Sequence, residues 1–175
     1  MPTSSPAISP GSSTPESAYA DSKALIEAWH GRGRLGYAVT PRFAHTSSPA
    51  QLDAAGRLLR EHPDVLLHTH LSENRAEIAQ VRAQFPDAPD YLGAYEKHGL
   101  VGDRSVLAHC LHLSDSEWMR MARAGASAAF CPSSNLFLGS GLFDLASAER
   151  HRVSMLFSMT VGACAVIAAA TFGVW

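Results

Sequence analysis

Short apolar runs alternate with longer amphipathic segments between Arg34 and Cys131. The short runs predict four strands, over residues 36–40, 64–70, 105–109 and 127–131. The longer segments predict helices over residues 48–61, 75–85 and 91–98, and between Ser114 and Gly125. Strands that alternate with helices in this way predict an α/β fold with a parallel sheet.

The expected helix ends carry local signals. Ser48 suits an N-cap because Pro49 would occupy the first helical position. Ser114 and Glu117 have the spacing of a capping box, and Gly125 is placed to end the same helix in a left-handed conformation. Gly99 has the equivalent position after the helix that begins at Tyr91. These signals indicate where the predicted helices begin and end.

Polar residues gather just after the expected strands, as they do at the carboxyl ends of barrel strands. We therefore predict about four consecutive central-to-late units of a (β/α)8 barrel of the TIM type. A complete barrel needs about 250 residues, so this chain of 175 residues is expected to hold part of one. A short doubly wound sheet fits the same periodicity and remains an alternative.

The two ends of the chain differ in composition from its centre. Residues 1–16 are rich in Ser and Pro and lack the basic start and apolar segment of a secretory signal, which predicts a disordered leader. Residues 17–152 form the predicted barrel domain. Residues 153–175 contain no charged side chain and are expected to be a divergent apolar tail. Its Ser, Thr and Gly residues favour a buried strand and loop or an aberrant terminus over a membrane span, which stays an alternative.

Charge and cysteine content narrow the partners and the compartment. The net charge is −2, and no cluster of Lys and Arg predicts binding to nucleic acid or a membrane surface. A small molecule is therefore the expected partner. The chain has three cysteines without a C-x-x-C spacing, which predicts neither disulfides nor a cysteine metal site and indicates a reducing compartment such as the cytoplasm.

Histidines at the expected strand ends are the candidate metal ligands. His68 and His70 share one side of a strand because strand side chains alternate with period two. Glu73 follows closely, as a carboxylate that could carry protons from a metal-bound water. His109 ends the neighbouring strand and would lie near His70, so that the two form part of a zinc site. His112 is interpreted as a surface residue or as a residue that contacts a metal ligand without binding the metal.

Two other groups of polar residues follow strands. Arg42 could donate hydrogen bonds to a substrate carbonyl, and Phe43 beside it could stack on a ring. Ser133, Ser134 and Asn135 form another polar strand-end loop, for which a role in the site and simple turn chemistry are both open.

Four segments together resemble the guanine deaminases of the amidohydrolase superfamily: GRLGYAVTPRF, HTHLSENRAEI, RSVLAHC and FCPSSNLFLGSGLFDL. The resemblance runs from about Ser17 to Arg150. It implies zinc-dependent hydrolytic conversion of guanine to xanthine and ammonia in purine catabolism, and a cytoplasmic homodimer. By resemblance His70 and His109 hold the zinc, and Glu73 moves protons between water and the ring. Arg42 binds the purine carbonyl, and Phe43 lines the pocket.

The chain also departs from the family's pattern. No His-x-His pair of a first barrel strand precedes Arg34, and Thr160 stands where the last-strand aspartate is expected if residues 161–163 match that segment. We therefore expect little turnover from this chain alone. Another amidohydrolase acting on a purine-like or triazine-like ring remains an alternative. So does a non-catalytic fragment that acts as an interaction partner or is tethered to a membrane by its tail.

Overall fold

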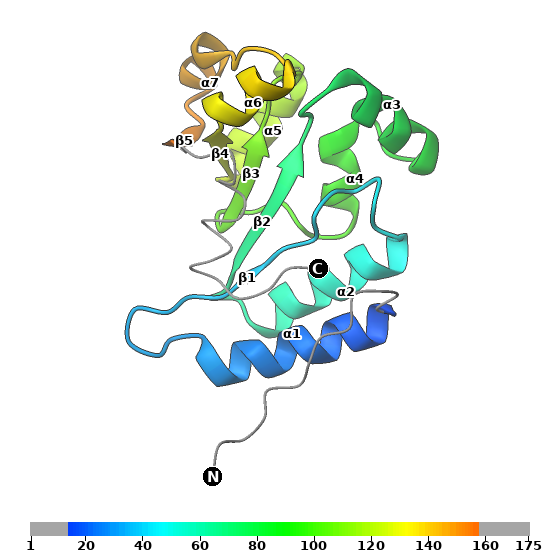
Figure 1. The fold of residues 1–175 in the computed structure, drawn as a ribbon, viewed down its shortest axis with the longest axis vertical. Coiled ribbons are helices and arrows are strands. Elements are labelled where there is room, and N and C mark those ends of the chain that lie inside the picture. Colours follow the sequence, from blue (N-terminus) through cyan, green and yellow to red (C-terminus); the bar gives the residue numbers. More distant parts are fainter. Residues whose placement is uncertain (1–13, 158–175) are drawn as a thin grey trace.

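A five-stranded parallel sheet organises the computed structural model, which describes residues 14–157 (Figure 1). Its strands are β1 (Ala38–Val39), β2 (Leu66–Leu71), β3 (Ser105–His109), β4 (Ser127–Phe130) and β5 (Ser154–Phe157). They lie side by side in chain order, and every neighbouring pair is parallel. A doubly wound sheet reverses its strand order at a switch point. The predicted α/β class with consecutive barrel-type units is therefore confirmed, with one strand more than expected.

Helices connect the strands and account for the parallel pairing. They are α1 (Pro15–Trp29), α2 (Pro49–Glu61), α3 (Arg75–Gln84), α4 (Tyr91–Lys97), α5 (Asp115–Ala124), α6 (Pro132–Leu138) and α7 (Leu145–His151). The bounds of α2 to α5 agree with the predicted helices within a residue or two. Figure 1 shows α3 and α6 at the end of the sheet toward which β2 and β3 point. The carboxyl ends of the strands are therefore flanked by helix starts.

The predicted caps are present. Ser48 and Gln51 form a capping box at the start of α2, in which each side chain binds the other residue's backbone N–H. Ser114 and Glu117 form the second box at α5. Gly125 ends α5 with a φ of 75°, a left-handed conformation that costs glycine no steric strain. These bonds satisfy backbone groups that a helix end would otherwise leave unpaired.

The outer boundaries and one strand-end segment differ from the predictions. α1 begins at Pro15, two residues inside the expected leader, because Thr14 Oγ1 caps the helix by accepting the Ser17 N–H and proline fits the first helical turn. β5 begins at Ser154, inside the segment expected to be a tail, and pairs with β4. Residues 132–138 form α6 rather than a polar loop.

The membrane alternative concerned the apolar C-terminal segment. Between residues 14 and 157, no helix has the length and apolar character needed to cross a bilayer. Residues 158–175 lie outside the described part of the chain.

The sheet buries both of its faces, and they differ in character. Leu67, Leu71 and Leu107 pack into the larger core together with helix residues such as Trp118 and Tyr95. The opposite face has a small cluster of its own, formed by Val106, Ala108, Ala129 and Cys131. His70 pairs in register with Ala108, so His68 and His70 belong to this second face. The second face of the sheet therefore carries the two histidines of β2.

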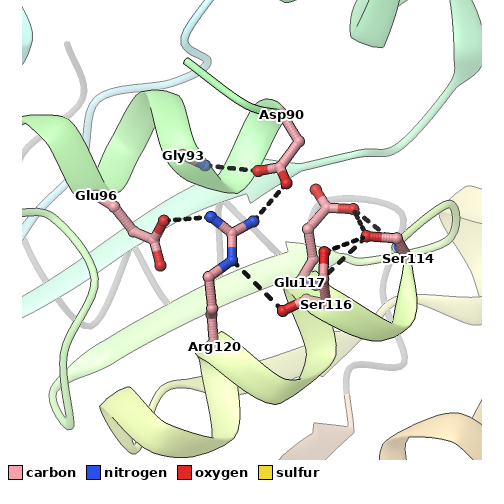
Figure 2. Close-up of polar contacts among 7 residues, drawn as sticks. All are labelled: Asp90, Gly93, Glu96, Ser114, Ser116, Glu117 and Arg120. Atoms are coloured by element: carbon pink, nitrogen blue, oxygen red, sulfur yellow. Dashed lines mark hydrogen bonds and ion pairs between the residues drawn. The ribbon is translucent and has the colours of Figure 1, made fainter.

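A network of charged side chains joins α4 to α5 (Figure 2). Arg120 donates to Glu96 at 2.6 Å and to Asp90 at 2.5 Å. The other carboxylate oxygen of Asp90 accepts from the Gly93 N–H and caps α4. Figure 2 shows the Arg120 guanidinium between the two carboxylates. The network thus joins the N-cap and the last turn of α4 to the middle of α5.

Candidate metal centre and active site

Three side chains converge at the carboxyl ends of β2 and β3. His70 is the penultimate residue of β2, Glu73 lies in the turn before α3, and His109 is the last residue of β3. Their potential ligand atoms all lie within 4.8 Å of one another, and Glu73 Oε1 is 3.7 Å from His109 Nε2. The two imidazole rings lie 5.2 Å apart and nearly parallel. The structure therefore brings together the residues for which the sequence predicted a metal ligand or proton-transfer role.

An unusual backbone conformation aims His109 at this cluster. Strict alternation would place His109 on the face of Leu107, opposite to His70. His109 and the following Cys110 instead have φ angles of 75° and 51°, in the left-handed region that non-glycine residues rarely adopt. Two backbone bonds hold the turn, from Cys110 N to Leu71 O and from Leu111 N to Ser72 O. Strain of this kind clusters at functional sites, where it fixes a side chain in a required direction.

Ser72 repeats this feature on the neighbouring strand. Its φ is 50°, and it directly precedes Glu73, which is 7% exposed. The left-handed residue ends β2 and turns the chain toward α3, whose N-cap is Asn74. Both strand ends are therefore kinked where a candidate site residue leaves the sheet.

Hydrogen bonds fix the orientation of both imidazoles. His70 Nδ1 lies 2.7 Å from the Arg42 carbonyl oxygen, which can only accept, so His70 carries its proton on Nδ1. His109 Nδ1 lies 2.6 Å from Asn135 Oδ1, which is also an acceptor. In the neutral form of each ring, Nε2 is then left without a proton. Partners of this kind on the far ring nitrogen are typical of metal-binding histidines.

Burial favours the neutral form of His68 and His70. It lowers the pKa of His70 to about 3, and the positive form of His109 nearby contributes to the same shift. Burial likewise lowers the pKa of His68 to about 4. Only a neutral imidazole can donate a lone pair to a metal ion. His70 is therefore neutral at neutral pH, which is the form that a metal ion requires.

The two predicted substrate-binding residues lie beside His70. The Phe43 ring stacks on the His70 ring with centroids 3.9 Å apart, and the exposed Arg42 guanidinium lies 5.4 Å from the Phe43 ring. Arg42 also contributes through its backbone, because its carbonyl accepts from the His70 ring. The three residues form a continuous edge of the cluster.

Glu73 also lines a cleft of about 540 Å³. Its lining is formed by Glu73, Asn74, Arg75, His112, Leu138, Gly139 and Ser140. The volume falls in the range of small-molecule sites. His112 Nε2 donates to the carbonyl of Ser140, which follows α6, at 3.1 Å, so His112 contributes to the cleft wall and lies outside the metal cluster. Arg42 and Phe43 do not line this cleft.

The remaining metal-type side chains near the cluster are less suited to bind an ion. His68 is 1% exposed, and neither ring nitrogen has a hydrogen-bond partner within residues 14–157. It lies outside the group whose donor atoms converge. Cys110 and Cys131 are buried free thiols, and burial raises the pKa of both, which disfavours the thiolate that a metal needs.

Asn135 contacts the cluster, although the sequence analysis gave it no role there and placed it only in a polar strand-end loop. It lies on α6, is 1% exposed, and holds His109 through its amide oxygen. The segment was interpreted as a loop. Pro132, which suits the first turn of a helix, was the available signal that the chain turns into a helix directly after β4.

The donor set fits a zinc ion. Two imidazole nitrogens free of protons and one carboxylate are the ligands and neighbours found around catalytic zinc. Such a site usually has at least three protein ligands. Thr160, which would stand at the position of a carboxylate ligand, lies outside the described residues.

The sequence matches the amidohydrolase family over residues 1–170. The chain therefore belongs to the amidohydrolase family. Its similar relatives include the guanine deaminase of Escherichia coli strain K12, to which it is 52% identical over 150 residues, 86% of this chain and 34% of that protein. The solved structure of E. coli guanine deaminase matches this chain with a TM-score of 0.84. The match covers 86% of this chain and 35% of that one.

Two further solved structures carry ligands. Guanine deaminase from C. acetobutylicum with bound guanine is 26% identical, with a TM-score of 0.79 over 86% of this chain and 36% of that one. An adenosine deaminase from Xanthomonas campestris with bound zinc is 27% identical, with a TM-score of 0.74 over 82% of this chain and 32% of that one. The chain thus spans about one third of the length of the relatives it matches.

Proposed function

We propose that this chain contributes part of the active site of a guanine deaminase, a hydrolase that converts guanine to xanthine and ammonia. The convergence of His70, Glu73 and His109 at two strand ends is the observation that carries the proposal. Identity of 52% to an E. coli guanine deaminase supports guanine as the substrate. A purine-like or triazine-like ring as the substrate of a different amidohydrolase is less well supported.

His70 and His109 would hold the metal through their Nε2 atoms, because both Nδ1 atoms are engaged by acceptors. We propose zinc, the ion bound in the related adenosine deaminase. Zinc would supply Lewis acidity that lowers the pKa of water toward neutrality. The kinked backbone at His109 and the stacked Phe43 ring would keep the two imidazoles in place without a ligand.

Glu73 would carry protons between the attacking water and the purine ring. It is almost fully buried, faces His109 Nε2 and lines the cleft in which a small molecule fits. A carboxylate in this position can accept a proton from the nucleophile and deliver it to a ring nitrogen and the departing amine. Deamination needs both transfers, and one group within reach of both atoms can perform them in turn.

Arg42 and Phe43 would position the substrate at the other edge of the metal cluster. The exposed guanidinium presents several N–H groups in one plane, which suits a purine carbonyl. The aromatic ring beside it offers an apolar surface for a planar heterocycle. Because Arg42 and Phe43 do not line the cleft beside Glu73, a substrate that contacts both parts would span the space in front of His70.

The remaining parts of the proposal concern the whole protein. A role in purine catabolism, a cytoplasmic location and a homodimer follow from the guanine deaminase assignment. The buried free thiols Cys110 and Cys131 agree with a reducing compartment. Because two histidines are fewer than a catalytic zinc usually requires, we expect little turnover from the 175-residue chain alone.

A chimera tests the proposal. Residues 14–157 of this chain would replace the corresponding segment of the E. coli guanine deaminase, so that the remaining ligands come from that relative. We expect the chimera to release ammonia from guanine and to leave triazine and adenosine substrates unchanged. A folded, zinc-loaded chimera that acts on another ring and not on guanine would disprove the substrate assignment.

A further inference from the structure

Tyr95 joins α4 to the end of β2 through a buried hydroxyl group. Its side chain is 0% exposed and belongs to the larger core. The Tyr95 hydroxyl oxygen lies 2.9 Å from the His70 carbonyl oxygen and 3.0 Å from Thr69 Oγ1. Thr69 shares the face of Leu67 and Leu71, because side chains alternate along a strand. Tyr95 therefore contacts β2 from the face opposite to the His70 side chain.

The chemistry of the groups fixes the direction of these two hydrogen bonds. A carbonyl oxygen can only accept, so the Tyr95 hydroxyl donates its one proton to the His70 carbonyl. The Tyr95 oxygen can then only accept from the Thr69 hydroxyl. Thr69 Oγ1 has a second acceptor within reach, the Arg42 carbonyl oxygen at 3.3 Å. A continuous set of polar contacts therefore runs from α4 through β2 to the segment that follows β1.

The segment that follows β1 depends on this part of β2 for its position. The ladder between β1 and β2 ends at the pair of Val39 and Leu67. Beyond it, the Arg42 carbonyl accepts from the His70 backbone N–H at 3.3 Å and lies within reach of the Thr69 hydroxyl. Arg42 and the aromatic residue after it are the proposed substrate contacts. A shift of Thr69 and His70 would therefore move the substrate-binding residues.

Tyr91 provides a comparison for the Tyr95 hydroxyl. It lies one helical turn earlier on α4, is 2% exposed, and its ring centroid is 5.4 Å from that of Tyr95. Between residues 14 and 157 the Tyr91 hydroxyl has no hydrogen-bond partner. Both rings pack in the larger core, whereas the Tyr95 hydroxyl also binds β2. The two tyrosines thus separate the effect of packing from that of the hydrogen bonds.

We propose that Tyr95 is a positioning residue that holds the end of β2 in the place where it fixes Arg42 and Phe43 for substrate binding. The inference rests on the proposed function for its substrate. It adds α4 to the elements that determine how tightly guanine binds, although no side chain of α4 (Tyr91–Lys97) lines the cleft or belongs to the metal cluster. Because the Tyr95 hydroxyl does not contact Glu73, its loss should weaken guanine binding and leave the chemical step unchanged.

The first experiment measures amide hydrogen exchange by NMR in the full 175-residue chain without metal. Tyr95→Phe keeps the ring and removes the hydroxyl. The His70 amide, which donates to Arg42, should then exchange about 3- to 10-fold faster, as expected for the loss of one buried hydrogen bond. Tyr91→Phe removes a buried hydroxyl from the same helix and should leave this rate within about twofold. An unchanged rate in Tyr95→Phe would overturn the proposal, and so would equal acceleration of the β3 amides, which indicates a general loss of stability.

The second experiment measures steady-state kinetics with guanine in the chimera, which carries Tyr95 within residues 14–157. Tyr95→Phe should raise KM for guanine about 3- to 10-fold, with kcat and zinc content within about twofold of the parent chimera. Tyr91→Phe should leave KM and kcat within about twofold. A fall in kcat at unchanged KM, or the same increase in KM in both variants, would contradict a role in positioning the substrate contacts.

Thr69→Val tests the same contacts from the side of β2. It removes the hydroxyl that lies between Tyr95 and Arg42 with little change in size, so KM should rise in the same direction. If Tyr95→Phe does not fold, as judged by circular dichroism, Thr69→Val carries the test, and a normal KM would overturn the proposal. A chimera without activity on guanine would contradict the proposed function, and exchange of the His70 amide would still decide whether Tyr95 positions the end of β2.

Discussion

Replacing Glu77 by Gln should stabilise the protein at alkaline pH but much less at acidic pH. Glu77 lies in the first turn of α3 with a side chain that is 4% exposed. Burial raises its pKa to about 7, and the negative charge of Glu73 adds to the shift. Its Oε1 atom has no hydrogen-bond partner within the described chain, so an amide nitrogen in that place removes no bond. The substitution therefore removes a buried charge with little change in shape.

Proton linkage gives the size and sign of the effect. The unfolded carboxyl titrates near 4.5 and the folded one near 7, so the folded state binds more protons between these values. The free energy of unfolding must then fall as pH rises through this window. From pH 5 to pH 8 the wild-type chain should lose about 2 to 3 kcal/mol through Glu77 alone. The Glu77→Gln variant should lack this loss.

Urea unfolding followed by circular dichroism at pH 5 and pH 8, with chelator present, measures the difference. Glu77→Gln should be more stable than wild type by about 3 kcal/mol at pH 8 and by about 1 kcal/mol or less at pH 5. Glu27→Gln, on the exposed side of α1, removes the same charge and should stay within about 0.5 kcal/mol at both values. A stability difference between Glu77→Gln and wild type that is the same at both pH values would refute the reasoning.

Two other substitutions test the substrate edge and the α4–α5 network. In the chimera, Arg42→Ala should raise KM for guanine. Its zinc content should change little, because the backbone carbonyl that accepts from His70 remains. Arg34→Ala is the control, and loss of zinc in Arg42→Ala but not in Arg34→Ala would contradict a substrate role. Arg120→Met should lower the free energy of unfolding of the full chain by about 1 to 2 kcal/mol at low salt, since it leaves two carboxylates without their partner. Lys97→Met, whose partner Asp87 is largely exposed, should cost less than about 0.5 kcal/mol, and an equal cost for both variants would argue against the network.

Local sequence signals predicted the elements well at positions where the backbone conformation strongly prefers one residue type. Ser48, Ser114 and Gly125 marked helix ends because capping and left-handed geometry depend on neighbouring residues alone. The apolar run ending at His109 marked β3 from its first to its last residue. The start of α1 was predicted to belong to a disordered leader, because serine and proline are typical both of disordered segments and of helix starts.

The site was only partly predictable because its geometry depends on contacts between distant residues. Strand alternation placed His70 on the correct face, but it would have turned His109 away from it. The left-handed φ angles at His109 and Cys110 reverse this direction, and the residue types at these positions do not predict such a conformation. The bond from His109 to Asn135 joins residues 26 positions apart and depends on the docking of α6. Periodicity carries no information about contacts of that kind.

Glu73→Gln in the chimera tests the central claim most directly. Glutamine keeps the shape and the buried position of Glu73 but cannot relay a proton, so zinc content should stay near that of the parent chimera. Turnover of guanine, followed as xanthine formation, should fall by about 10²- to 10⁴-fold. Near-normal turnover by a zinc-loaded Glu73→Gln chimera would contradict the account.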